Sequence, residues 1–314
     1  MDQVAHEAAS PAQVGRPVRV VSLSFRIGSK SLDEIAAVID REGKAACDLI
    51  ALPETWTGPT PERVDGAVIT TLAALAARHH TYIVCPIYRR DGVQRLNSAI
   101  LLGRQGEMAC IYDKVYPYWS EFEMQPAVQI GSHVPVYAAD FGRIGMAICF
   151  DVNFPAVWQR LADQGAELVI WPSAYSAGGS LQAHAINYHF AIVTATSTGD
   201  CQVYDITGQR ILDEQMDEQS DGLNISRITL DLDRGIYHEN FNRDKRDRLL
   251  LEHGDNVMQE QWLPREEWFV LKAKRAGISA RALAREYGLE ELRDYLSRSR
   301  RAIDAMRGGE FGAL

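Results

Sequence analysis

Residues 18–25 read VRVVSLSF, an alternating and β-branched run that predicts a strand. Ser31 then begins a predicted helix, because Glu34 stands three residues later and completes a reciprocal Ser/Glu capping box. Residues 48–54, DLIALPE, form a short apolar run that predicts a buried strand leaving the sheet at its Pro-Glu end. A strand, a helix and a second strand in this order indicate an α/β layered domain.

The same pattern continues to about residue 232, first as strands alternating with helices and then as paired strands. We expect helices over 66–79, 154–164 and 181–190 and a hairpin within 134–149. We also expect a turn at Gly208 and strands over 81–88, 97–102, 107–113, 167–171, 191–197, 202–211 and 224–232. The pattern therefore predicts one α/β domain over residues 18–238.

Composition narrows the class of protein. The 314 residues suffice for a large core without disulfides, and the five cysteines are odd in number and mostly lie in apolar runs, so a reducing cytoplasm fits best. No apolar run approaches the roughly 20 residues of a membrane helix. The net charge of -9 argues against general nucleic-acid binding and is compatible with a small uncharged or cationic partner.

The two ends differ from the central domain. Residues 1–17 are polar and Ala-rich, and we interpret them as a flexible tail and not as a secretory signal. Residues 239–314 are charged and helix-forming, so we expect a mainly helical C-terminal arm. Its segment SARALAREYGLEELRDYLSRSRR, with a turn at Gly288, is compatible with a helix-turn-helix, but a helical arm packing on its own domain or on a partner subunit is favoured.

Three polar residues follow apolar strands and complement one another chemically. They are Glu54, Lys114 and Cys149. Cleavage of an amide-like bond by a thiol needs a proton acceptor, a cation for the developing oxyanion, and the sulfur itself. The alternatives are a buried apolar cysteine and two surface charges, and spacing alone does not decide between them. Side chains at the carboxyl ends of strands nevertheless gather at one edge of an α/β sheet.

Other chemistry-bearing motifs are absent from the sequence. The pairs His79-His80 and His184-His189 lack the i, i+4 spacing of a helical zinc site. There is no GxGxxG, GxxxxGK[ST] or GxSxG segment. We therefore expect neither a metal nor an organic cofactor.

Three ordered segments resemble the nitrilase superfamily of carbon–nitrogen hydrolases. LPETW (52–56) is similar to its glutamate motif, YDKVYP (112–117) to its lysine motif and GRIGMAICFDVNFP (142–155) to its cysteine motif. The likeness runs from about residue 18 to about residue 235. It implies a four-layer α-β-β-α sandwich, a small amide-type substrate and assembly into homodimers or larger homo-oligomers.

The resemblance also implies roles for individual residues. Glu54 would be the general base, Lys114 the stabiliser of the tetrahedral intermediate and Cys149 the acylated nucleophile, with the backbone N–H of Phe150 completing the oxyanion hole. Many members carry a second glutamate after the lysine. Glu121 fits that position, and Glu123 is the alternative.

Departures from the family pattern bear on the substrate. Asp151 stands where true nitrilases carry Glu, which favours amide or N-carbamoyl hydrolysis over nitrile hydrolysis. Asn153 replaces an Arg that often binds a substrate carboxylate, so a neutral or differently anchored substrate is expected. Acyl transfer to an amine and a catalytically silent binding protein remain alternatives. The expected substrate-binding residues are Tyr118, Trp119, Phe150, Asn153, Ser173, Tyr175 and His184, although aromatic residues in such runs often belong to the core.

Overall fold

A computed structural model of the chain describes residues 13–216 and 221–309. The chain divides into two compact units, one formed by residues 18–230 and the other by residues 231–314 with the described part of 1–17. The expected tail over 1–17 lies mostly outside the described residues. Within the described part, Val14 pairs with Ala276 and the backbone N–H of Arg16 donates to Asp231.

The first sheet of the larger unit contains seven strands in the order β13-β1-β2-β3-β4-β5, with β6 paired to β4. β1 is parallel to β2 and β2 to β3, while β4 and β5 continue as antiparallel strands. The strands are β1 (Pro17–Phe25), β2 (Leu49–Ala51), β3 (Tyr82–Asp91), β4 (Gln94–Leu102), β5 (Met108–Asp113), β6 (Val128–Gln129) and β13 (Leu223–Asp231).

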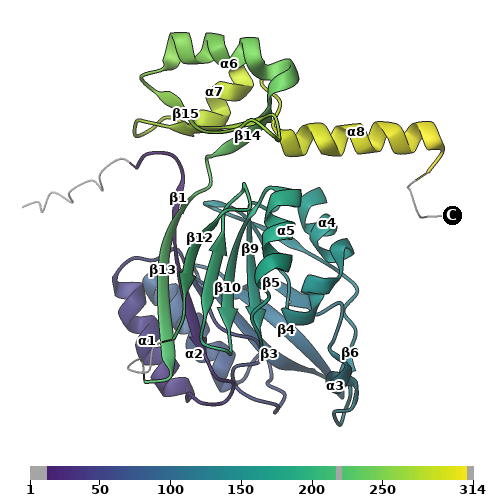
Figure 1. Cartoon of the computed structure of the whole chain (residues 1–314). Helices are drawn as coiled ribbons and strands as arrows, with labels where there is room; N and C mark the ends of the chain where they lie inside the picture. The colour runs from purple at the N-terminus through teal and green to yellow at the C-terminus, as the bar shows by residue number, and fades with distance from the viewer. Residues whose placement is uncertain (1–12, 217–220, 310–314) are drawn as a thin grey trace, which may run out of the picture. The chain divides into compact units, whose positions relative to one another are not determined.

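Two helices, α1 (Leu32–Lys44) and α2 (Ala67–His79), cover one face of this sheet (Figure 1). The predicted capping box at the start of α1 is present, since the Ser31 side chain accepts from the backbone N–H of Glu34 while the Glu34 carboxylate accepts from Ser31. Alternate residues of β1 point into the core beneath these helices, so the helix-facing side of the sheet is apolar.

The second sheet contains six strands in the order β12-β11-β10-β9-β8-β7. Its strands are β7 (Val136–Ala139), β8 (Gly142–Met146), β9 (Leu168–Ser173), β10 (Ala191–Thr196), β11 (Cys201–Tyr204) and β12 (Arg210–Glu214). The helices α4 (Pro155–Asp163) and α5 (Gly178–Tyr188) cover it, and the short segments α3 (Trp119–Phe122) and η1 (Cys149–Asn153) lie in connections.

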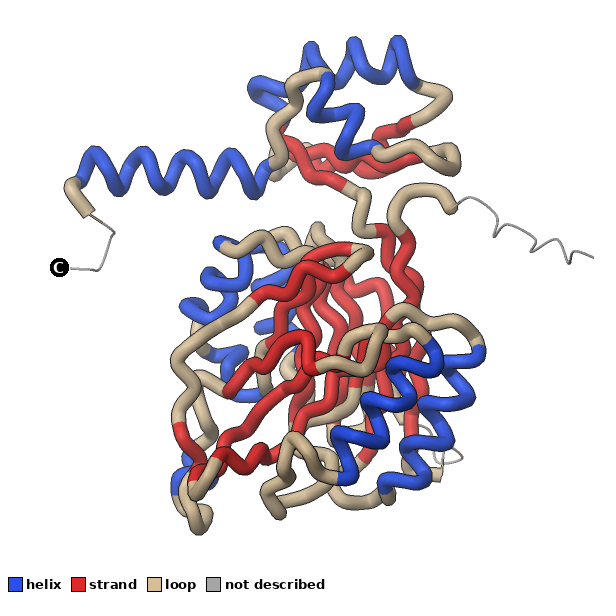
Figure 2. The backbone as a smooth tube through the Cα atoms, turned by 180° about the vertical axis from the view of Figure 1, so that it is seen from behind, coloured by secondary structure: helices blue, strands red, loops and turns tan. Residues whose placement is uncertain are grey.

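The two sheets pack face to face between the helical layers (Figures 1 and 2). Ser22 Oγ on β1 donates to the carbonyl of Thr194 on β10 at 2.6 Å, and Ser24 Oγ accepts from the N–H of Thr196 at 3.0 Å. These buried bonds tie the inner faces together. The predicted α-β-β-α sandwich is confirmed. The stretch expected as a strand over 202–211 is the β11–β12 hairpin, and Gly208, expected at a turn, lies in its turn with φ 77°.

The smaller unit holds a three-stranded antiparallel sheet in the order β14-β16-β15. Its strands are β14 (Gly235–His238), β15 (Val257–Leu263) and β16 (Trp268–Ala273), and its helices are α6 (Glu239–His253), α7 (Ala280–Glu286) and α8 (Leu292–Arg307). The expectation of a mainly helical arm thus missed a sheet, whose apolar residues pack against α6 and α7. The three consecutive polar residues within VMQEQWL obscured its strand pattern.

The segment considered as a helix-turn-helix consists of α7, a turn at Gly288 with φ 74°, and α8. Only Leu292 of α8 is buried, while Leu296, Ile303 and Met306 are exposed along the helix. DNA binding by this segment stays an untested alternative. Across the described ranges, none of the helices combines the length and apolar character needed to span a bilayer.

Candidate active site

Glu54, Lys114 and Cys149 follow the carboxyl ends of three strands. Glu54 lies three residues beyond β2, Lys114 directly follows β5, and Cys149 begins the short η1 helix just after β8. Strands β2 and β5 belong to one sheet and β8 to the other, so the polar residues meet where the two sheets end. Residues far apart in sequence therefore share one location, as expected for side chains that follow the carboxyl ends of strands.

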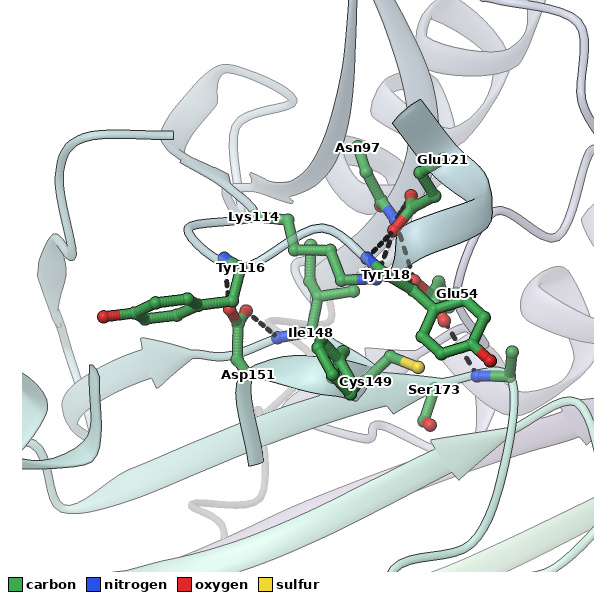
Figure 3. Close-up of polar contacts among 12 residues, drawn as sticks. Glu54, Asn97, Lys114, Tyr116, Tyr118, Glu121, Ile148, Cys149, Asp151 and Ser173 are labelled. Carbon is green, nitrogen blue, oxygen red and sulfur yellow. Dashed lines mark hydrogen bonds and ion pairs between the residues drawn. The ribbon is translucent and has the colours of Figure 1, made fainter. Parts of the chain in front are cut away.

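The centre of this location is a buried ammonium between two carboxylates (Figure 3). Lys114 Nζ lies 2.8 Å from Glu54 Oε1 and 2.7 Å from Glu121 Oε2. The side chains of Lys114, Glu54 and Glu121 are 1%, 5% and 6% exposed, so water screens these charges little. Glu123 is exposed, and of the two candidates for the second glutamate only Glu121 contacts the lysine.

Neutral donors hold both carboxylates in place. Asn97 Nδ2 donates to Glu54 Oε1 at 2.7 Å and to Glu121 Oε1 at 2.8 Å. The N–H of Ala174 donates to Glu54 Oε2 at 2.9 Å, and the N–H of Tyr118 donates to Glu121 Oε2 at 2.7 Å. Each glutamate is thereby fixed at both of its oxygens.

Cys149 is buried beside this cluster, at a backbone φ of 46° that non-glycine residues seldom adopt. Burial, together with the neighbouring Glu54 charge, raises the pKa of the Cys149 thiol, while Lys114 opposes the rise. Burial alone would lower the pKa of Lys114, but the charges of Glu54 and Glu121 raise it above its usual value. The resting site therefore holds a neutral thiol next to a charged lysine.

Asp151 connects the cysteine segment to the lysine segment. Its carboxylate accepts from the N–H of Ile148 at 2.9 Å and from the N–H of Tyr116 at 2.9 Å (Figure 3). It also accepts from the hydroxyl of Tyr112 at 2.6 Å. Burial raises the pKa of Asp151 to about 6, and the three donors oppose that rise. Asp151 thus fixes the position of Cys149 relative to Lys114.

Replacing Asp151 with alanine is expected to lower the free energy of unfolding at pH 5 by about 3 kcal/mol or more, because three buried donors lose their acceptor. The pKa of Asp151 in the folded protein lies above its ordinary value of 3.8. The contribution of the Asp151 carboxyl to the free energy of unfolding therefore falls as pH rises through about 6. The loss caused by Asp151→Ala should therefore be smaller at pH 8 than at pH 5.

Urea unfolding at the two pH values measures this effect. Asp91→Ala is the matched control, since Asp91 forms a surface ion pair with Arg89 and its side chain is 63% exposed. The control should change stability by less than about 1 kcal/mol. Equal losses in the two variants would contradict the role assigned to Asp151.

A pocket of about 460 Å³ opens onto the cluster. Of the expected substrate-binding residues, Tyr118, Phe150, Asn153 and Tyr175 line it. The complete lining consists of Ile27, Glu54, Thr55, Tyr88, Lys114, Tyr118, Ser120, Glu121, Cys149, Phe150, Asn153, Ala174 and Tyr175. Aromatic rings form much of this wall, which favours a ligand whose apolar group lies next to the polar centre.

Three expected substrate-binding residues do not line this pocket. The Trp119 side chain is 72% exposed on α3. Ser173 is fully buried, its hydroxyl accepts from the N–H of Tyr175 at 3.0 Å, and it opposes the rise in the pKa of the Cys149 thiol. His184 stacks on Trp158 at 4.2 Å. Its Nε2 lies 2.8 Å from the carbonyl of Val152, and burial lowers its pKa, so it packs α5 against α4 and η1.

Several residues of the site were missed from the sequence. Asn97 and Tyr88 both contact Glu121, but each lies in a mostly apolar strand, which predicts a position in the core. A polar asparagine within the buried run LNSAILL was the available signal. In the parts of the chain that the structure describes, no group of three His, Cys, Asp or Glu side chains is placed to bind a metal ion.

A thiol, a lysine and two carboxylates around one pocket are typical of enzymes that transfer an acyl group through cysteine. The sequence model of the family described as carbon-nitrogen hydrolase matches residues 28–235. The chain belongs to the carbon-nitrogen hydrolase family. The resemblance to the nitrilase superfamily, on the side of its amidases and carbamoylases, is confirmed by this match and by the relatives below.

Curated relatives agree with this assignment. A beta-ureidopropionase of Arabidopsis thaliana is 31% identical over 159 residues, covering 45% of this chain and 39% of the plant protein. A deaminated glutathione amidase of Synechocystis sp. is 27% identical over 199 residues, covering 54% of this chain and 73% of that protein. The chain therefore spans well under half the length of the plant relative.

Solved structures show the same fold. An amidase from Nesterenkonia sp. has a TM-score of 0.61 at 20% identity, covering 78% of this chain and 99% of that chain. Saccharomyces cerevisiae Nit3, a member of the nitrilase superfamily, has a TM-score of 0.59 at 19% identity, covering 69% and 91%. The smaller unit beyond residue 235 lies outside the family match.

Proposed function

We propose that this protein hydrolyses a non-peptide amide or N-carbamoyl bond through a thioester on Cys149. The observation that carries the proposal is the pocket in which Cys149 lies beside the Glu54–Lys114–Glu121 cluster. In the first half of the cycle, the thiol proton passes to Glu54 as the sulfur attacks the carbonyl carbon. Lys114 and the N–H of Phe150 stabilise the resulting oxyanion.

Collapse of the tetrahedral intermediate breaks the carbon–nitrogen bond. Glu54 returns the proton to the leaving nitrogen, and ammonia or an amine departs, leaving the thioester. In the second half, Glu54 takes a proton from water and the hydroxide attacks the thioester carbon. The carboxylic acid leaves, and the proton on Glu54 goes back to the Cys149 sulfur, which restores the resting enzyme.

The contacts of Glu54 support Oε2 as the oxygen that accepts and returns protons in this cycle. Oε1 already accepts from Lys114 and Asn97, whereas Oε2 accepts only from the N–H of Ala174 among the hydrogen bonds of the described residues. The same N–H also stabilises the Cys149 thiolate, which supports Oε2 as the oxygen nearer the nucleophile. Oε2 therefore keeps a lone pair for the thiol proton.

The pocket's charge favours a neutral substrate. Its charged lining residues are Glu54, Glu121 and Lys114, so two carboxylates face one ammonium and one negative charge is left uncompensated. Asn153 supplies an amide at the wall and no cation. A carboxylate on the substrate would meet like charge in a region of low exposure.

A hydrolysis screen with matched substrates tests both parts of the proposal. Pentanamide should give a kcat/KM at least about tenfold above that of glutaramate, which replaces the terminal methyl with a carboxylate. Ammonia release is the readout, and N-carbamoyl amines and pentanenitrile extend the screen. A preference for glutaramate would contradict the neutral-substrate prediction, whereas no turnover of any compound would contradict the hydrolase itself.

Two alternatives have their own outcomes in the same screen. Transfer of the acyl group to an added amine would appear as a new amide, and a silent binding protein would bind amides without releasing ammonia. The Asp151 position and the relatives named as amidases favour hydrolysis of amides over nitriles. Homo-oligomerisation and a cytoplasmic location stay predictions, the former to be measured by light scattering.

A further inference from the structure

The side chain of Asn97 touches both glutamates of the cluster and nothing else among the described residues that its amide can pair with. It lies on β4, it is fully buried, and it does not line the pocket. Its single amide nitrogen donates to Glu54 at 2.7 Å and to Glu121 at 2.8 Å. Each of the two amide hydrogens therefore serves one carboxylate.

The orientation of this amide is fixed by charge. Asn97 Oδ1 is buried and accepts no hydrogen bond within the described residues. A flipped amide would direct that oxygen at two carboxylates, which is unfavourable, so the nitrogen faces them although the oxygen is left unpaired. An unpaired buried acceptor is a cost that the contacts of the nitrogen offset.

We propose that Asn97 is a positioning residue that holds Glu54 and Glu121 apart around Lys114 and keeps Glu54 Oε2 free to accept the thiol proton. This inference rests on the proposed function. Without the Asn97 donors, the two carboxylates would compete for Lys114, whose one charge does not compensate both. The backbone reinforces the link, because the carbonyl of Asn97 accepts from the N–H of Lys114 at 2.8 Å.

The experiment compares Asn97→Leu, Asn97→Asp and a matched control, Asn242→Leu. Asn242 is also fully buried, and its Nδ2 also donates to two acceptors, the carbonyls of His238 and Glu290, but it lies in the smaller unit. All three variants are assayed for amide hydrolysis as a function of pH and for thermal unfolding. Asn97→Asp keeps the side-chain size if the leucine variant does not fold.

Asn97→Leu should lower kcat by about 10- to 100-fold, which is the range expected for losing hydrogen bonds to a charged group. The KM should change little, because Asn97 does not line the pocket. The acidic limb of its rate profile should move to higher pH, because the ionised base loses a donor. Asn97→Asp should lose more activity as pH rises, since it adds a third carboxylate. Asn242→Leu should lose stability but keep kcat and the pH profile.

The outcomes separate this inference from the proposed function. An Asn97→Leu or Asn97→Asp protein with wild-type kcat and an unmoved pH profile, from a wild type that hydrolyses amides, overturns the positioning role alone. Loss of activity only in proportion to the unfolded fraction, as in the control, overturns it as well. A wild type that hydrolyses no amide overturns the proposed function and this inference together.

Discussion

Replacing Cys149 with alanine is expected to lower amide turnover by on the order of 10⁴-fold or more, because no other group in the pocket supplies the attacking sulfur. The fold should survive, since alanine keeps the Cβ and meets the same backbone constraint at φ 46°. Ammonia release measures the activity, and circular dichroism with thermal unfolding measures the fold.

Cys85→Ala is the matched control for this prediction. Cys85 is fully buried in β3 and does not line the pocket. Both substitutions remove one buried sulfur, so they should have similar effects on stability, but only Cys149→Ala should abolish turnover. Wild-type hydrolysis by the Cys149 variant would refute the assignment of the nucleophile.

Replacing Lys114 with methionine is expected to lower the free energy of unfolding by about 3–5 kcal/mol, because two buried carboxylates lose their common counter-ion. Turnover should also fall by about 10²- to 10³-fold, since the oxyanion loses its charged donor. Methionine has nearly the length of lysine, so the change removes mainly the charge. Chemical unfolding and ammonia release measure the two effects.

Two further variants test whether the loss of stability in Lys114→Met has an electrostatic cause. Lys272→Met removes a lysine that pairs with Glu260 at 2.8 Å while 35% exposed, and it should cost no more than about 1 kcal/mol. Adding Glu121→Gln to Lys114→Met should restore part of the lost stability, because one of the two carboxylates that repel each other is then neutral. A double variant that is no more stable than Lys114→Met would contradict the electrostatic explanation.

The layered fold and the centre of the site were predictable because their signals are local. The VRVVSLSF strand, the Ser31 capping box and the DLIALPE strand each follow from a few neighbouring residues. Glu54, Lys114 and Cys149 were singled out by their place after such strands, and the structure brings them together. The roles of these residues rest on the experiments above.

Other features depend on contacts that sequence spacing does not reveal. His184 follows a strand and was expected at the substrate, but its stacking on Trp158 makes it part of the helix packing. Asn97 looked like a residue of a core strand, because only the folded chain brings the two glutamates to its amide. In the smaller unit, β15 shows no clear alternation, because its polar residues Gln259–Gln261 are partly buried while the apolar Met258 and Trp262 are exposed.

The most direct measurement is the mass of the Cys149 peptide during turnover of p-nitrophenyl pentanoate, an activated ester that should acylate the enzyme faster than the thioester hydrolyses. After rapid acid quenching, the peptide should carry a pentanoyl group in place of the thiol hydrogen, with close to one acyl group per active site and a matching burst of nitrophenol. Cys149→Ala should show neither. Turnover of the ester with an unmodified Cys149 peptide, or a burst adduct on another residue, would contradict the account.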